Sequence, residues 1–347
     1  LADAGYHVGH WRKAGGPGNW RALGREREAA RPRHESFEAF LDARPEGAPF
    51  CFWLGSSDPH RGYDPGSGER SGIDPAAVFL PPPYPDAAEI RSDVADYYFE
   101  VQRFDRDVGR ALALLEERGE LEDTLVVMTG DHGWPFPRGK TNLYDLGVRV
   151  PLAVRAGARL GGDFERGLRV SCPVSLTDLA PTFLEVADLD PLPHATGTSL
   201  LPLLQGELCE RTAVVLGRER HTPAQAEPSM AGYPARALRT ERWLLVLNLE
   251  PDRWPAGVPQ GATHPMAVHA DCDDSPTKQW ILQHREDPAG REAYQLCFGR
   301  RPAVELYDCV ADPGQVRDLA DDPACSEIVE DLRQQLVTRL VAIGDPR

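Results

Sequence analysis

The sequence predicts an α/β fold with a mostly parallel sheet, followed by a smaller C-terminal α+β domain that contains an antiparallel sheet. Two short apolar runs, residues 49–55 and 124–130, have the length and composition of buried strands. Helical periodicity fills residues 86–119 between them. The order strand, long helix, strand predicts a parallel pair joined by a crossover, which is the unit of an α/β core.

The first strand and the long helix each end at a residue type that favours a stop. The run PFCFWLG at 49–55 enters a polar loop at Ser56, and this loop carries His60. Gly119 is well placed to end the helix. One face of the helix is apolar at three- and four-residue steps, at Ile90, Val94, Tyr97, Val101, Phe104, Val108, Leu112 and Leu115.

The second strand, TLVVMTG at 124–130, runs directly into Asp131, His132 and Gly133. Loops beyond the carboxyl ends of parallel strands lie at one edge of a sheet and form its ligand crevice. His60 and the Asp131–His132 pair both fall at that edge. We therefore expect these side chains to lie in one pocket.

The stretch from 129 to 152 carries the densest functional signal. Asp131 offers a hard carboxylate oxygen, His132 offers an imidazole, and Lys140 returns after a Pro-containing turn. A carboxylate of this kind suits calcium or magnesium, and a neighbouring cation suits an anionic group that also touches the metal. The tripeptide Asp-His-Gly alone is more typical of a strand-ending turn, so the residues leave both interpretations open.

The remaining elements divide the chain into two predicted domains. After about Gly206, short apolar pieces alternate with loops rich in Pro, Asp and Gly. We expect an α/β domain at 1–205 and a smaller C-terminal domain at 206–347. The further predicted elements are strands at 150–155, 212–217 and 242–249 and helices at 175–189 and 327–343.

Charge excludes some partners. The formal net charge of −16 disfavours binding to nucleic acid or anionic lipid, because both need a basic face. No apolar run is long enough to span a bilayer. We expect no nucleic-acid partner and no membrane span, and a polyanionic substrate would need a local basic pocket.

Longer motifs carry a resemblance to a known family. GDHG followed by GKTNLYDLGVRVPL resembles the sulfatase family of the alkaline-phosphatase-like superfamily. Other similar segments are LADAGYHVG, SSDPHRGY, DRDVGRALALLEERGELEDTLVVMTGDHG, SLTDLAPTFLEVADL and ELYDCVADPGQVRDLA. GRERHTP, YPARALRTERWLLVLNLEPDRWP and CFGRRPAVELYD are most similar to the heparan N-sulfatase (sulfamidase) branch. The resemblance implies an alkaline-phosphatase-like α/β/α sandwich.

The resemblance also implies residue roles. Asp131 and His132 become calcium ligands, while Lys140 and Lys13 contact sulfate oxygens. His60 becomes the proton donor to the leaving group, although a loop histidine held by hydrogen bonds would have the same sequence signature.

At the start of the second domain, the resemblance places three residues near the sugar of the substrate, namely Arg218, Glu219 and His221. Exposed charged residues in a loop are more often simply solvated. Together these roles imply a calcium-dependent hydrolase of sulfuric ester or sulfamate bonds in sulfated carbohydrate.

The nucleophile of this family is a formylglycine made from Cys or Ser in a C/S-x-P-x-R motif. The chain has seven scattered cysteines without a CxxC pair, and none stands in that motif; Cys51 precedes Phe-Trp-Leu and Cys172 is followed directly by Pro. Their odd number leaves at least one free thiol. We expect the nucleophile and a pair of calcium-binding aspartates in a missing N-terminal segment, so the chain as given should lack activity.

Two other functions remain as alternatives. One is a phosphomonoesterase or phosphodiesterase of the same superfamily, and the other is a non-catalytic glycan-binding relative. The sequence leaves open the sulfated substrate, N–S or O–S cleavage, and the oligomeric state, with a homodimer among the options. Family habit favours a periplasmic or secreted location.

Overall fold

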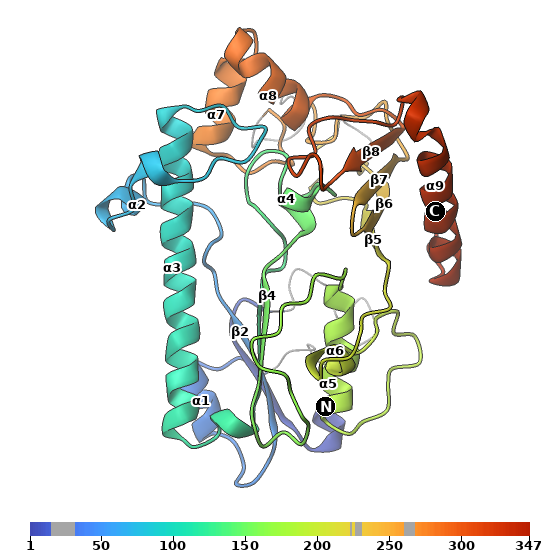
Figure 1. Ribbon diagram of the computed structural model, residues 1–347. Coiled ribbons are helices and arrows are strands. Elements are labelled where there is room, and N and C mark those ends of the chain that lie inside the picture. Colours follow the sequence, from blue (N-terminus) through green and yellow to red (C-terminus); the bar gives the residue numbers. More distant parts are fainter. Residues whose placement is uncertain (15–31, 223, 226–230, 260–267) are drawn as a thin grey trace.

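The computed structural model describes residues 1–347 except 15–31, 223, 226–230 and 260–267 (Figure 1). Its strands are β1 (His7–Arg12), β2 (Phe50–Gly55), β3 (Leu125–Thr129), β4 (Leu152–Ala156), β5 (Ala213–Arg218), β6 (Ala235–Thr240), β7 (Trp243–Asn248) and β8 (Val304–Asp308). Its helices are α1 (Phe37–Asp42), α2 (Ser67–Arg70), α3 (Ala88–Glu117), α4 (Asp145–Val148), α5 (Leu179–Val186), α6 (Leu201–Leu204), α7 (Pro276–Gln283), α8 (Pro288–Phe298) and α9 (Ser326–Ala342). The strands and helices predicted from the sequence are all present.

The strands of the N-terminal half form two separate pairs within the described residues. β1 and β2 run parallel, with His7 opposite Phe50, and α1 lies in the connection between them. β3 and β4 run antiparallel, with Leu125 opposite Ala156. The predicted hydrogen-bonded pair of β2 with β3 is wrong for the described residues, because β2 pairs with β1 and the chain turns back after β3 to pair with β4.

Helices lie on both sides of these strands. Figure 1 shows α3 on one side of β2 and β4, with α5 and α6 on the other. On the α3 side, Phe40 of α1 and Leu115 of α3 pack with Phe52 of β2 and Val126 of β3. The helix, sheet, helix order agrees with the predicted α/β class.

The C-terminal sheet is antiparallel, as predicted, and its strand order is β5-β6-β7-β8; β6 and β8 were not among the predicted strands. α9 packs on one face of this sheet, where Leu336 meets Leu238 and Leu245. Alternate residues face the other way, and there Leu244 packs with Tyr144 from the segment just before α4. The sheet is therefore covered on both faces.

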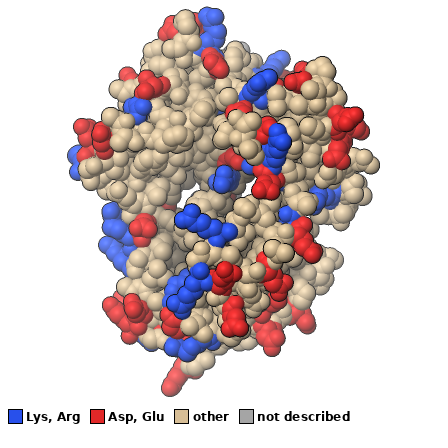
Figure 2. Space-filling model, in the orientation of Figure 1, with Lys and Arg blue, Asp and Glu red and all other residues tan. Residues whose placement is uncertain are grey.

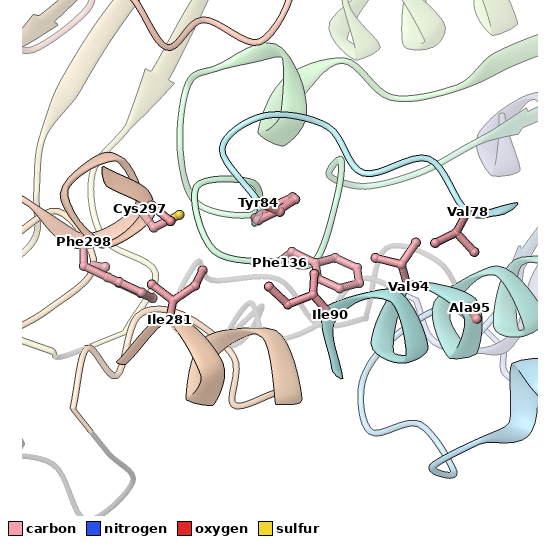
Figure 3. Close-up of a cluster of buried hydrophobic side chains, with 11 residues drawn as sticks. Val78, Tyr84, Ile90, Val94, Ala95, Phe136, Ile281, Cys297 and Phe298 are labelled. Atoms are coloured by element: carbon pink, nitrogen blue, oxygen red, sulfur yellow. The ribbon is translucent and has the colours of Figure 1, made fainter. Parts of the chain in front are cut away.

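A further core joins early and late parts of the chain (Figure 3). Ile90 and Val94 of α3 pack with Phe136, with Ile281 of α7 and with Phe298 of α8. α7 and α8 follow the predicted boundary at 205/206 in sequence but pack on the helix that precedes it. This contact joins α7 and α8 to α3 and to the segment that carries Phe136.

Within the described ranges, none of the helices has both the length and the apolar character required to cross a bilayer. The 30-residue α3 is long enough, but it carries charged residues along its length.

Candidate active site

All of the predicted site residues line one wide cavity of about 2130 Å³. They are Lys13, His60, Asp131, His132, Lys140, Arg218, Glu219 and His221. Three of them stand beyond the ends of strands: Lys13 follows β1, His60 follows β2 and Asp131 follows β3. In Figure 2 a hollow opens near the centre of the molecule, with Lys and Arg side chains beside it.

Lys13 and Asp131 form an exposed ion pair at the ends of β1 and β3. Their Nζ and Oδ2 atoms are 3.1 Å apart, and the two side chains are 55% and 67% exposed. Gly55 allows the end of β1 to approach, because a Cβ at that position would lie 1.4 Å from the Lys13 carbonyl oxygen. Burial acts to raise the pKa of Asp131, but His132 and Lys13 outweigh it and hold that pKa below its usual value.

His132 presents one ring nitrogen toward Asp131. Its Nδ1–H donates to the Gly133 carbonyl at 2.9 Å, which leaves Nε2 unprotonated in the neutral ring and 3.8 Å from Asp131 Oδ1. Burial lowers the pKa of His132, so the neutral form is favoured. Gly133 is required here because an added Cβ would lie 2.3 Å from the Leu146 carbonyl oxygen.

A carboxylate beside a neutral imidazole nitrogen fits two ligand positions of a divalent cation. The described part of the chain contains no group of three His, Cys, Asp or Glu side chains that could hold a metal ion. Asp131 and His132 therefore fit a metal as two ligands of a larger set.

His60 is exposed in the loop after β2, and its Nδ1–H donates to the Arg61 carbonyl at 2.5 Å. The adjacent Arg61 holds this loop in place. Its guanidinium makes a bidentate pair with Asp93 of α3, at 2.7 and 3.1 Å, and donates to the Pro135 carbonyl at 2.9 Å. Asp93 also accepts from the backbone N–H and hydroxyl of Thr277 in α7. The buried Arg61 thus ties the His60 loop to the loop that follows Asp131.

Lys140 is paired with a residue that the sequence analysis missed. Its Nζ lies 2.9 Å from Oδ2 of Asp273, and the side chains are 13% and 26% exposed. Burial acts to raise the pKa of Asp273, but the hydrogen bond and charge of Lys140 outweigh it and lower that pKa.

Arg218 and His221 share a second missed residue, Asp271. Arg218 forms a buried ion pair with Asp271, and His221 Nδ1 lies 3.0 Å from the same carboxylate. Glu219 instead forms ion pairs with Arg236 and Arg347 at 2.7 and 2.8 Å. All three predicted sugar-site residues therefore line the cavity, but the Glu219 carboxylate is already paired with two arginines.

Comparison with known proteins adds independent support for the resemblance. The sequence model of the Sulfatase family matches residues 33–189. Human N-sulphoglucosamine sulphohydrolase is 34% identical over 317 residues, which cover 88% of this chain and 58% of that protein. An ulvan-active sulfatase of Formosa agariphila is 29% identical over 269 residues, covering 77% and 41%. The chain spans about half the length of these curated relatives.

The fold is also shared with solved structures. A protein solved in complex with its substrate D-glucosamine-2-N,6-O-disulfate superposes with a TM-score of 0.56 at 18% sequence identity. The match covers 88% of this chain and 68% of that one.

Proposed function

This chain belongs to the sulfatase family, and from that premise we propose that it hydrolyses sulfuric ester or sulfamate groups of a sulfated carbohydrate. The observation that carries the proposal is the meeting of Lys13, Lys140 and His60 with the Asp131–His132 pair on one cavity wall. Besides a nucleophile, sulfate hydrolysis uses cations and a metal to neutralise the sulfate oxygens and a proton donor for the leaving group, and these residues can supply those supporting groups.

The two lysines place positive charge beside Asp131 and His132, although the chain as a whole has a net charge of −16. Each ammonium has three donors, so Lys13 and Lys140 can keep their carboxylate partners and still donate to sulfate oxygens. Fixed donors aimed at oxygens that gain negative charge stabilise the transition state without reorganisation.

Calcium is part of the proposal, with Asp131 and His132 as two of its ligands. When bound, a divalent cation neutralises charge on the sulfate oxygens. The lowered pKa of Asp131 keeps its carboxylate ionised, and the lowered pKa of His132 keeps its imidazole neutral, which are the states that bind metal.

His60 is proposed as the proton donor. Its Nδ1–H is engaged by the Arg61 carbonyl, so Nε2 is the atom that can carry a proton to the leaving oxygen or nitrogen. Arg61 and Asp93 act as positioning residues, because their buried pair fixes the loop from which His60 projects.

Sulfated glucosamine is the substrate class that the relatives suggest, through the name of the human relative and the sugar bound in the solved neighbour. A periplasmic or secreted location is proposed with it. The disulfide between Cys172 and Cys209 supports an oxidising compartment. The other five cysteines are free, whereas the odd count required at least one free thiol.

The test is a turnover panel on the complete protein, using glucosamine 2-N-sulfate, glucosamine 6-O-sulfate, an aryl sulfate and the matching aryl phosphate. We expect release of sulfate from at least one sugar and slower phosphate release. Asp131→Ala should abolish turnover, whereas Asp190→Ala, an exposed acid that does not line the cavity, should not change it. Preferred phosphate release would support a phosphoesterase, and saturable sugar binding without turnover would support a glycan-binding relative.

A further inference from the structure

The loop 268–275 places two aspartates against residues that line the cavity: Asp271 pairs with Arg218 and His221, and Asp273 pairs with Lys140. Its base is anchored by Lys278 of α7, whose side chain is almost fully buried. The Lys278 ammonium donates to the carbonyls of His269 and Cys272, at 3.1 and 2.8 Å. Ser275 caps α7 by accepting from the Lys278 backbone N–H at 3.0 Å. A buried cation bound only through carbonyls fixes the loop backbone, and with it the two acids.

Asp271 and Asp273 differ in how many hydrogen-bond acceptor sites of the carboxylate remain open. Asp271 accepts from Arg218, from His221, and from the backbone and hydroxyl of Thr222 at 2.9 and 2.8 Å. A carboxylate offers about four acceptor sites, so Asp271 is saturated. Its role is to hold Arg218 and His221 in place.

Asp273 accepts one hydrogen bond in the described structure, from Lys140 to Oδ2. Among the described residues, Oδ1 has no hydrogen-bond partner, and the side chain is 26% exposed to solvent. His60 and His221 line the same cavity as Lys140. An ionised acceptor therefore stands beside the lysine that is proposed to contact sulfate.

We propose that Asp273 is a specificity-determining residue, which accepts a hydrogen bond from a sugar hydroxyl on the carbon next to the sulfated one. The inference rests on the proposed function, because it takes Lys140 as the sulfate contact. Lys140 bridges the two groups: one N–H stays on Asp273 and the others reach sulfate. The ligand class is a saccharide sulfate with a free vicinal hydroxyl, since an anionic acceptor rejects analogues that lack the donor.

The experiment is equilibrium binding of the 347-residue chain to sodium sulfate, glucosamine 2-N-sulfate and the 3-deoxy analogue of that sugar. The wild type should bind the hydroxyl-bearing sugar about tenfold more tightly than the 3-deoxy analogue, as expected for a hydrogen bond to a charged group. Asp273→Ala should remove this preference and bind inorganic sulfate at least as tightly, because Lys140 loses its anionic partner. Asp274→Ala is the matched control, since Asp274 lies on the same loop, is exposed and, among the described residues, bonds only to Ser275 and Gln279.

The outcomes separate the two proposals. Equal wild-type affinity for both sugars, with measurable sulfate binding, would overturn the role of Asp273 and leave the proposed function standing. Weaker sulfate binding by Asp273→Ala, with the sugar preference retained, would also overturn it, because Asp273 would then only position Lys140. Asp273→Asn keeps the side-chain size and checks that any loss is not a folding defect. Absence of binding to all three probes would overturn both proposals.

Discussion

Asp131 lines the cavity and Asp271 lies behind the cavity-lining Arg218; both are paired with a cation, but their surroundings differ. Asp131 is 67% exposed and its partner Lys13 is 55% exposed. Asp271 is 5% exposed and its partner Arg218 is 8% exposed. The exposed carboxylate has acceptor capacity left for a ligand, whereas the buried one is saturated by protein donors. Exposure thus separates a residue suited to chemistry from a residue suited to holding the site together.

The largest expected effect is on stability and falls on the buried pair. Asp271→Ala leaves Arg218 buried without its carboxylate, so the free energy of unfolding should fall by about 3–5 kcal/mol. Asp131→Ala should cost less than about 1 kcal/mol, because exposed ion pairs contribute little. Urea unfolding of both variants measures the difference. Equal losses would show that exposure does not divide the two carboxylates as argued.

Two of the three histidines that line the cavity, His60 and His221, should also differ, with a smaller effect measured on turnover. His60→Ala in the complete protein should lower kcat about 10²-fold on a sugar sulfate, because general-acid catalysis contributes about that much. The loss should be far smaller on an activated aryl sulfate, whose leaving group needs no proton. His221→Ala should instead raise KM on the sugar, since His221 is held by Asp271. Equal losses on both substrates would make His60 a sulfate-binding residue.

Asp131, the exposed carboxylate, was predicted from the sequence as a site residue, whereas Asp271, the buried one, was not. Asp131, His132 and His60 follow apolar strands, and the ends of such strands are predictable from composition and period. Asp271 and Asp273 lie in the segment HADCDDS, which follows no strand pattern. Acids in such loops are usually solvated, so only the packing of α7 and the burial of Lys278 reveal their position.

The strand pairing shows a related limit. Period and length located β2, β3 and β4 but missed β1, because its sequence HVGHWR gives a weak strand signal, and they did not show which strands pair. Pairing depends on how the intervening chain turns: α1 makes β1 and β2 parallel, and the return after β3 makes β4 antiparallel. Local sequence carries little information about either connection.

The loss of stability at acid pH is a further test that distinguishes Asp271 from Asp131. We expect its effect on the free energy of unfolding to be smaller than that of Asp271→Ala. Burial acts to raise the pKa of Asp271, but His221, Arg218 and Thr222 outweigh it and lower that pKa. A carboxyl whose folded pKa is depressed adds stability above its unfolded pKa, about 3.9, and loses it as the pH falls through the folded value. Between pH 5 and 3, Asp271→Asn should therefore lose less stability than the wild type. Salt near 1 M should weaken the contribution of the Asp131–Lys13 pair but hardly that of Asp271–Arg218. If the free energy of unfolding of Asp271→Asn fell with pH as steeply as that of the wild type, the lowered pKa of Asp271 would be contradicted.

The smallest expected effect on stability is that of added calcium, and of the two carboxylates only the exposed Asp131 should bind it. A hard cation seeks six or more oxygen ligands, and the described residues offer it one carboxylate and one imidazole at Asp131 and His132. We therefore expect the 347-residue chain to bind calcium with a Kd of roughly 10⁻⁴–10⁻³ M or weaker.

At a calcium concentration equal to Kd, the folded state gains only about 0.4 kcal/mol, so the shift in Tm should be small. Calorimetric titration and thermal unfolding measure the two quantities. Asp131→Ala should abolish the response, and Asp190→Ala should keep it. Extending the chain toward the length of its relatives should strengthen binding if the further ligands lie outside these residues. Micromolar binding by the present chain, unaffected by Asp131→Ala, would place the metal elsewhere and remove the chemical role that exposure assigns to Asp131.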